Sequence, residues 1–403
     1  STATRLTISS TGTATLTNSN SGLVVKNSGA SNKEWRVGGG SAGQFLITEV
    51  GVADRFTIAA GGAVTMSGAL TVGSLDIGHG ANGDTASTAV GQNALDANGS
   101  ATTAVGNTAI GDGALTALNH NDADYNTMVG RNAGSSITSG DRNVGVGASA
   151  LLNSDTGTGN TAVGTNSLGA DCADDNVAIG YNTLVAFTGS DATAVGSGAA
   201  DVATSAANLT AVGKGAAGAL TEGDDNTVIG TEALDSCLTG AQNTVVGKHA
   251  AREVTGSSNV MVGMNAGYHA STVDHCVAIG RNAFLGASGN TEGDYNVAIG
   301  NYSLDAATTG HSNVAIGYNT LTAATTNHST VAIGHRAMQL ADGGEHYSVA
   351  VGAYALNTEA SGSDGTVAIG YYALKSQDGG TGNVAVGYNA ANGLDNGTDN
   401  VFI

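Results

Sequence analysis

From about residue 85 to the C-terminus, the chain repeats one short apolar pattern. It is clearest as Asn-Val-Ala-Ile-Gly at residues 176–180, 296–300 and 313–317. Val or Ile stands directly before the glycine, Ala usually stands two positions before it, and Val or Thr three positions before it. A small residue follows three positions after the glycine, and the next is often Leu. The pattern predicts a short β-branched strand, a bend at glycine and a second short apolar segment.

The glycines of these copies define the register of the repeat. From Gly130 onward they are 16, 17 or 18 residues apart, except for an interval of 20 residues between Gly280 and Gly300. A fixed period over this length is typical of a solenoid. The first copies can be registered in two ways, because Gly106 fits nearly as well as Gly111. The anchor glycines are Gly91, Gly111, Gly130, Gly147, Gly164, Gly180, Gly196, Gly213, Gly230, Gly247, Gly263, Gly280, Gly300, Gly317, Gly334, Gly352, Gly370 and Gly387.

Stacking of the repeats is expected to build the core. A unit of about 17 residues cannot bury its own apolar face, so we expect an all-β, elongated parallel β-roll or β-solenoid whose coils rise ~4.8 Å each. Eighteen such coils predict a rod of roughly 85 Å. Alternation sends the β-branched residues to one side of each strand and Ala to the other. We expect the β-branched side to fill the core of one chain and the flat Ala side to pack against another chain.

The N-terminal part follows a different pattern. Short alternating segments such as Trp35-Arg-Val37, Phe45-Leu-Ile47 and Arg55-Phe-Thr-Ile58 are separated by Gly, Ser and Asn turns. This spacing predicts a β-rich segment at residues 1–80, completed by packing between chains, followed by the repeat β-roll at residues 81–403. The chain begins without Met and stops just before the next anchor glycine would fall, so we expect further sequence at both ends.

Composition narrows the class of protein. The chain has 63 Gly, no Pro and 11% charged residues, which suits a backbone whose N–H groups are nearly all needed for ladder bonds. Few charges and few aromatic residues argue against a compact enzyme core, and we expect no catalytic residues. The net charge of −20 argues against a nucleic-acid partner, although it admits bound cations. No segment predicts membrane insertion or secretion. Three cysteines in different coils predict free thiols.

Two parts of the sequence resemble known families. The run from Glu34 to Gly73, with Gly61-Gly62 and Ser67-Gly-Ala-Leu-Thr-Val-Gly73, is similar to modules common in bacteriophage tail fibres. The Asn-Val-Ala-Ile-Gly repeats resemble the head repeats of trimeric autotransporter adhesins. The second resemblance implies a left-handed parallel β-roll with three chains around an axis. Together they imply an extracellular homotrimer on a virion or a cell surface, with other tail or fibre proteins and a host glycan or protein as partners.

Asparagine and the turn residues are the first candidates for a role beyond packing. Asn recurs four residues before the glycine and again two residues after it, where stacked amides and left-handed turns would account for it. Six residues before the glycine stands a turn residue, often Asp, and in late coils this position holds His311, His328 and His346. We call it the turn slot. Two interpretations remain open for it: a divalent-metal or pH-sensitive stripe, or solvated turns with side-chain capping.

Tyrosines crowd the C-terminal third, and several of them stand one or two residues after the glycine. Exposed aromatic rings stack on sugars or cover a protein surface, and the alternative is packing on the rod itself. Gly213-Lys-Gly-Ala-Ala-Gly218 matches G-x-G-x-x-G, but it falls within the repeat register and precedes no predicted helix, so we expect no nucleotide site. The candidates for surface binding are Tyr302, Tyr318, Tyr354, Tyr371, Tyr372 and Tyr388.

The sequence therefore predicts a structural fibre of a phage tail that mediates or supports attachment to a host cell. Two alternatives remain open. One is the passenger of a trimeric adhesin on a bacterial surface, and the other is a fibre that cleaves glycans at an acidic cleft.

Overall fold

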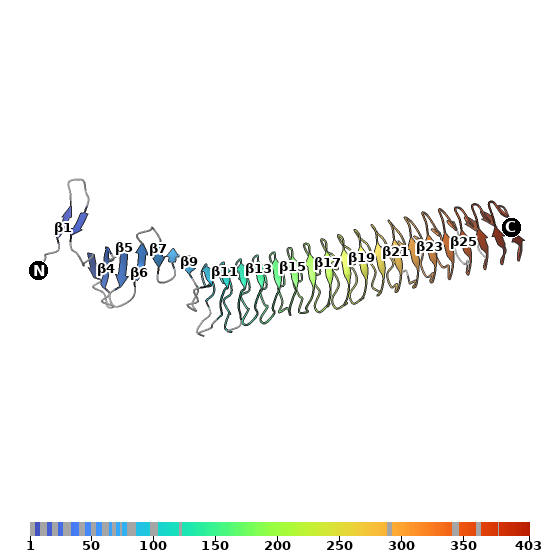
Figure 1. The fold of residues 1–403 in the computed structure, drawn as a ribbon. Helices are drawn as coiled ribbons and strands as arrows, with labels where there is room; N and C mark the ends of the chain where they lie inside the picture. The colour runs from blue at the N-terminus through green and yellow to red at the C-terminus, as the bar shows by residue number, and fades with distance from the viewer. Residues whose placement is uncertain are drawn as a thin grey trace.

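The computed structural model describes nine N-terminal strands and most of the repeat region. The described residues of the repeat region are 86–96, 104–120, 123–287, 292–340, 346–359, 364–377 and 379–403. The described part of the chain contains strands and turns and no helix. The protein is a long rod, with its termini at opposite ends (Figure 1).

The N-terminal strands pair antiparallel. β1 pairs with β2, the five strands β3 to β7 form a meander, and β8 pairs with β9. Short strands are therefore confirmed here, while their side chains, and with them the predicted packing between chains, lie outside the described residues. The strands are β1 (Arg5–Ile8), β2 (Ala14–Thr17), β3 (Leu23–Lys26), β4 (Glu34–Gly39), β5 (Phe45–Glu49), β6 (Asp54–Ile58), β7 (Val64–Met66), β8 (Leu70–Val72) and β9 (Leu75–Gly78).

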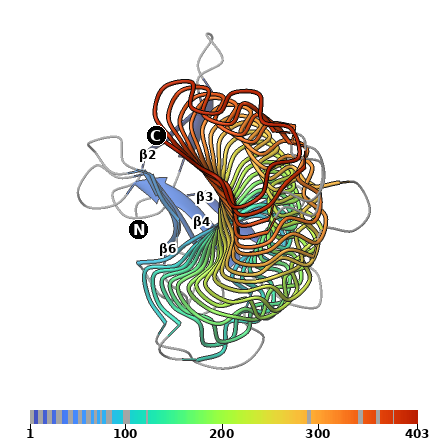
Figure 2. The same ribbon diagram turned by 90° about the vertical axis from the view of Figure 1, so that its right-hand side faces the viewer.

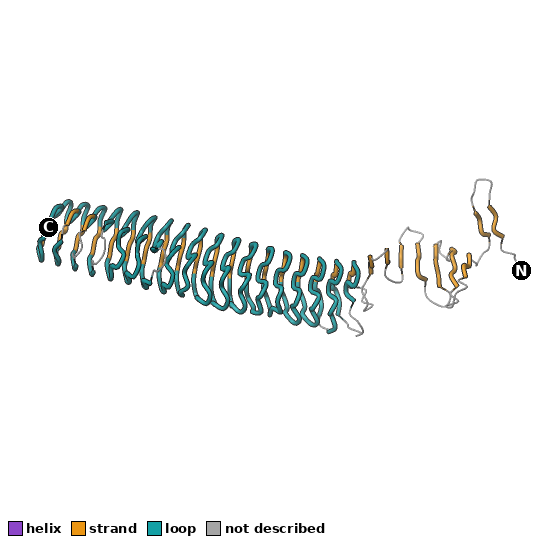
Figure 3. Tube along the Cα trace, turned by 180° about the vertical axis from the view of Figure 1, so that it is seen from behind, coloured by secondary structure: helices purple, strands orange, loops and turns teal. Residues whose placement is uncertain are grey.

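The repeat region forms one parallel sheet, with one short strand from each coil. β9 pairs antiparallel with β10, and from β10 onward every neighbour is parallel and in register. The sheet ends at β30 and does not close on itself (Figures 1 and 3). The strands are β10 (Thr88–Val90), β11 (Thr108–Ile110), β12 (Thr127–Val129), β13 (Val144–Val146), β14 (Thr161–Val163), β15 (Val177–Ile179), β16 (Thr193–Val195), β17 (Thr210–Val212), β18 (Thr227–Ile229), β19 (Thr244–Val246), β20 (Val260–Val262), β21 (Val277–Ile279), β22 (Val297–Ile299), β23 (Val314–Ile316), β24 (Val331–Ile333), β25 (Val349–Val351), β27 (Val367–Ile369), β29 (Val384–Val386) and β30 (Val401–Phe402).

The predicted parallel β-solenoid is therefore confirmed, with each anchor glycine directly after its strand. The ambiguity in the first coils is resolved in favour of Gly111, because β11 ends at Ile110. Gly106 lies in the turn before that strand. Two further strands, β26 (Thr358–Glu359) and β28 (Ser376–Gln377), pair parallel on the opposite wall of their coils.

The prediction of which strand face is buried was wrong. The central residue of each strand, usually Ala, points into the coil, and Ala178 and Ala315 are fully buried. The β-branched neighbours point outward, so that Ile179 keeps 40% of its surface exposed. The reason is the narrowness of the coil. Its opposite wall contributes the large side chains, including Leu184 and Phe187, and leaves space for only a small residue on the strand.

Where a methionine points inward from the strand, a glycine makes room for it. Met128 stands in the Ala position of β12, and a Cβ on Gly145, its neighbour in β13, would collide with the Met128 sulfur. Likewise, a Cβ on Gly267 would lie 2.6 Å from the sulfur of Met261. The core is thus packed coil against coil, and the size of one residue constrains the next.

The opposite wall is built from residues with alternating left-handed backbone. Asn182 has a φ of 51° and Leu184 a φ of 50°, and this pairing recurs in most coils. The left-handed Asn two residues after the glycine was predicted, whereas the left-handed Leu was not. Asn182 donates its N–H to Thr165 in the preceding coil, and Leu184 donates its N–H to Ala199 in the following coil. Burial of the Leu side chain, about 1.5–3 kcal/mol, offsets the cost of its backbone conformation.

The anchor glycines are required by both conformation and space. Gly263 has a φ of 137°, and a Cβ added to it would lie 2.5 Å from the carbonyl oxygen of Gly280 in the next coil. Any side chain there would push successive coils apart. The bend that the sequence predicted at glycine is therefore also the closest approach between coils.

Buried asparagines bond one coil to the next at the position four residues before the glycine. The amide oxygen of Asn243 accepts the backbone N–H of Asn259 at 3.0 Å, and its amide nitrogen donates to the carbonyl of Gly256 at 3.0 Å. Each side chain thus satisfies one donor and one acceptor that the turn leaves unpaired. This confirms the structural interpretation of these residues. The buried members are Asn107, Asn126, Asn143, Asn160, Asn176, Asn226, Asn243, Asn259, Asn296, Asn313 and Asn383.

The three cysteines are free, as predicted, and they are also buried. Burial raises the pKa of Cys276 to about 12 and that of Cys172 to about 11, so both remain thiols at neutral pH. Cys276 replaces an asparagine of the buried row. Its N–H donates to Asn259 at 2.9 Å, and its sulfur accepts the N–H of Asn296 at 3.4 Å.

Replacement of an anchor glycine should separate two coils. We expect Gly263→Ala to lower the free energy of unfolding by about 3–5 kcal/mol, from backbone strain and the clash with Gly280 combined. Gly365→Ala is the matched control. Gly365 also has a positive φ, of 65°, but a Cβ there meets nothing within 4 Å, so we expect a loss of only about 1 kcal/mol. Equal midpoints of the two variants in guanidinium would contradict the role of the contact between coils.

Loss of a buried side-chain amide should lower the free energy of unfolding more than loss of an exposed one. We expect Asn243→Ala to destabilise the rod by about 2–3 kcal/mol, because the N–H of Asn259 and the carbonyl of Gly256 lose their partner in a buried place. Asn153 makes a single exposed bond, from its amide to the Gly169 carbonyl at 2.7 Å. Asn153→Ala should therefore cost about 0.5–1 kcal/mol. Denaturant unfolding followed by circular dichroism measures both, and a similar loss in both variants would argue against the buried row.

Candidate functional surfaces

The predicted tyrosines line up along one surface row of the rod, which we call the tyrosine row. It consists of Tyr302, Tyr318, His335, Tyr354, Tyr371, Tyr372 and Tyr388. The sequence-based prediction named only tyrosines and so did not include His335. It stands directly after Gly334, as Tyr318 stands after Gly317, and that shared position was the available signal.

Neighbouring rings in the tyrosine row cover one another. The rings of Tyr318 and His335 stack with centroids 5.6 Å apart and planes 12° apart, and Tyr371 stacks on Tyr388 at 5.6 Å and 13°. The hydrogen bond with Tyr372 raises the pKa of Tyr371 to about 12. Because stacked partners come from successive coils, the ring faces are turned along the rod towards each other.

Cations cover further ring faces in this row. The guanidinium of Arg336 lies 5.8 Å from the ring centre of Tyr354, and that of Arg281 lies 5.7 Å from Tyr302. The Lys375 ammonium lies 4.6 Å from Tyr372. A sugar stacks on a free ring face, and each ring of this row already has a ring or a cation beside it. Binding by these six tyrosines remains a prediction, and their geometry favours packing on the rod.

The three histidines of the turn slot stack on one another. The ring centres of His311 and His328 are 4.1 Å apart, and those of His328 and His346 are 5.0 Å apart with planes 9° apart. The first pair is tilted, with planes 33° apart, so only His328 and His346 stack in parallel. Among the described residues, no group of three His, Cys, Asp or Glu side chains is placed to hold a metal ion. The metal interpretation of this stripe stays an untested prediction.

Side chains at the turn slot accept a backbone N–H of the preceding coil, and His takes the place of Asp in this role. Asp274 accepts the N–H of Ser257 at 2.6 Å, and Asp364 accepts the N–H of His346 at 2.8 Å, so each carboxylate caps the preceding coil. In the same way Nδ1 of His328 accepts the N–H of His311 at 3.2 Å. This bond requires an unprotonated Nδ1. Burial, with further contributions from His311 and His346, lowers the pKa of His328.

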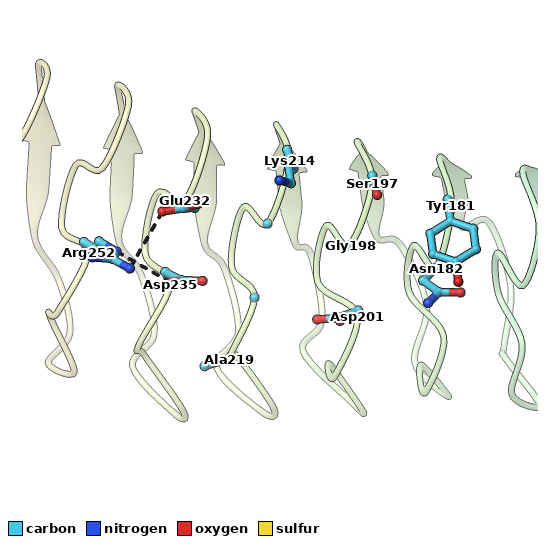
Figure 4. A pocket seen from close by; sticks show the side chains of 12 residues that line it. Tyr181, Asn182, Ser197, Gly198, Asp201, Lys214, Ala219, Glu232, Asp235 and Arg252 are labelled. Carbon is cyan, nitrogen blue, oxygen red and sulfur yellow. Dashed lines mark ion pairs between the residues drawn. The ribbon is translucent and has the colours of Figure 1, made fainter.

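A second surface feature lies near the middle of the rod, and we call it the mid-rod groove. It has a volume of about 560 Å³ and crosses five successive coils, from Tyr181 to Arg252 (Figure 4). Its polar side chains are Asn182, Asp201, Lys214, Glu232, Asp235 and Arg252. The remaining lining residues are small, namely Ser197, Gly198, Gly215, Gly218 and Ala219.

The groove exists because three glycines stand where other coils carry larger side chains. A Cβ on Gly198 would approach only Asp201, at 4.0 Å, and one on Gly215 would approach only Glu232, at 3.7 Å. A Cβ on Gly218 would come within 2.8 Å of the Asp235 carboxylate. Gly213 to Gly218 is the G-x-G-x-x-G segment, which lies in the repeat register in turn structure, as predicted, and contributes to the lining of the groove.

Charges at one end of the groove are paired. Arg252 lies 3.7 Å from Glu232 and 3.7 Å from Asp235, and it contacts the hydroxyl of Tyr268. These pairs are partly exposed and contribute little to stability. They do fix the position of two carboxylates at the groove wall (Figure 4).

The outward face of the parallel sheet is rich in Val and Ile, with Thr at the start of several strands in its N-terminal half. Each strand directs two residues outward, usually Val or Thr at its start and Val or Ile at its end. We call these residues the outer Val/Ile face. The exposed Val and Ile residues among them are Ile110, Val146, Ile179, Ile229, Ile279, Ile369, Val386 and Val401. A row of exposed Val and Ile of this length is unusual on a monomer.

Fold and surfaces together define the class of protein as a parallel β-solenoid of stacked coils of about 17 residues. Comparisons with protein-family models, with curated proteins and with solved structures found no match. The described residues include no helix that is long and apolar enough to cross a membrane.

Acid should weaken the coils that hold the histidine stack. His328 has a folded-state pKa below its usual 6.5, so its contribution to stability is present above pH 6.5 and is lost as the pH falls through the folded value. Protonation removes the acceptor for the His311 N–H and places like charges 4–5 Å apart. The carboxylates of the neighbouring turn-slot residues are already hydrogen-bonded. Asp294 accepts the backbone N–H of Asp274, and Asp364 accepts that of His346.

We therefore expect His328→Asp to reduce the loss of Tm between pH 7.5 and pH 5.0, because aspartate accepts the same bond and stays ionised at pH 5. Differential scanning calorimetry at the two pH values measures this. His335→Gln, in the tyrosine row, serves as the control and should keep the wild-type difference. An unchanged pH dependence in His328→Asp would show that the stack does not contribute to acid sensitivity.

Proposed function

We propose that this protein is a structural fibre of a phage tail and that it works as a homotrimer that supports attachment to a host cell. The observation that carries the proposal is the outer Val/Ile face. A stripe of Val and Ile along a rod of this length needs a partner of equal length, and a second and third copy of the chain supply one.

The twist of the rod supports packing of several chains around a common axis, and the number three comes from the resemblance to trimeric adhesin heads. Viewed along the rod, the strands stay near one line while the outer bends of the coils fan around it (Figure 2). Three chains packed parallel around that line would bury their Val/Ile faces together. The turn slot, the tyrosine row and the mid-rod groove would remain on the outside.

The charge of the chain supports a soluble fibre. The net charge of −20 comes from acidic residues, many of which stand in turns such as Asp124, Asp224 and Asp294. Repulsion between these turns opposes sideways association of finished fibres. The resemblance of the N-terminal segment to tail-fibre modules favours the phage tail over a bacterial surface adhesin. No observation here favours glycan cleavage by the rod.

The trimer is tested by the mass in solution. We expect the full chain to have three times the 39.2 kDa of one chain, measured by light scattering coupled to size exclusion. Ile279→Glu should convert it to monomers that keep their β circular dichroism, because three charges would meet on the axis. Leu238→Glu is the matched control, since Leu238 is 56% exposed on an outer bend and should leave the trimer intact. A monomeric wild-type chain at micromolar concentration would overturn the trimer.

The location is tested by immunogold electron microscopy of phage particles and bacteria from the source culture, with antibodies raised against this chain. Label on phage tails supports the proposal. Label on the bacterial surface alone would instead favour the adhesin passenger.

A further inference from the structure

We infer that the mid-rod groove is a binding site for a neutral oligosaccharide. The inference deepens the proposed function, since an attachment fibre would use such a site to bind surface glycans.

The first argument is the free ring of Tyr181. This side chain is 57% exposed and stands at one end of the groove. Figure 4 shows the ring face-on in the view into the groove. Among the described residues, no other ring or cation lies over it, in contrast to the tyrosine row. An exposed, unpartnered aromatic face is the platform on which the apolar face of a sugar ring stacks.

The second argument is the shape of the groove. From Tyr181 to Arg252 it crosses four coil spacings, about 19 Å, which is long enough for several linked sugars. Its glycine residues let a ligand approach the backbone closely. The left-handed positions of Gly198 and Gly215 are filled by Tyr302, Tyr354 or Arg336 in other coils, so the backbone itself does not require glycine there.

The third argument is the balance of charge. The lining includes three carboxylates, Asp201, Glu232 and Asp235, and two cations, Lys214 and Arg252, so the groove is nearly neutral in a chain of net charge −20. Asp201 and Lys214 form no ion pair within the described structure and are available to a ligand. Carboxylates, an ammonium group and the Asn182 amide offer acceptors and donors for hydroxyl groups. A polyanion would be repelled by the chain as a whole.

The experiment measures binding of the full-length protein to maltohexaose, cellohexaose and N-acetylchitohexaose by isothermal titration calorimetry, with a hyaluronan hexasaccharide as the anionic comparison. We expect at least one neutral probe to bind and the anionic probe to bind more weakly. Tyr181→Ala should raise the Kd about tenfold or more through loss of stacking.

Two further variants separate filling of the groove from a general effect of mutation. Gly215→Tyr places in the groove a side chain that the same backbone position accepts at Tyr302, and it should abolish binding while the Tm stays near wild type. Asn265→Tyr makes the corresponding change outside the groove and should bind as wild type. Tyr388→Ala, in the tyrosine row, should also leave the Kd unchanged.

Failure of all three neutral probes to bind would overturn the inference, as would binding that survives both Tyr181→Ala and Gly215→Tyr. Preference for the hyaluronan probe would show that the ligand is acidic, against the charge argument. The mass of each sample separates this result from the proposed function. A trimer that binds no probe refutes the groove alone, and a monomer that binds through the groove refutes the trimer alone.

Discussion

The structure depends on the in-register contact between each coil and the next. A coil of about 17 residues has no core of its own, so its backbone groups and apolar side chains are satisfied only by its neighbours. The anchor glycines set how closely the coils approach, and the buried asparagines bond the turns that the sheet cannot. Since every coil repeats these contacts, stability accumulates along the rod as nearest-neighbour terms. A defect in one coil therefore acts on the two interfaces it shares.

Sequence periodicity was sufficient to predict the architecture. Val, Ala and Ile before a glycine specify strand, alternation and bend, and the glycine spacing specifies the register of the solenoid. The stacked asparagines and the left-handed Asn after the glycine also followed from the pattern. Each of these properties is local to a coil or repeats with it, so one sequence contains the signal many times.

What the sequence could not decide was which face of the strand is buried. Alternation separates Ala178 from Ile179 but does not say which side the chain folds over. That choice depends on the distance between the two walls. The distance is set by residues such as Leu184, whose left-handed backbone conformation is not predicted by its residue type. The groove was missed for a related reason. Gly198, Gly215 and Gly218 look like ordinary repeat glycines until stacking brings them together beside Tyr181.

The left-handed position two residues after the anchor glycine has a consequence for how such a protein diverges. Asn, Tyr, Glu, His, Arg and Gly all occupy it with nearly the same backbone, as in Asn182, Glu232, His249 and Tyr302. The side chain there points away from the core, and the wall behind it keeps its form. Substitutions at this position can therefore change the outward side chain of one coil without changing the others. Related fibres can then differ in specificity while they share one scaffold.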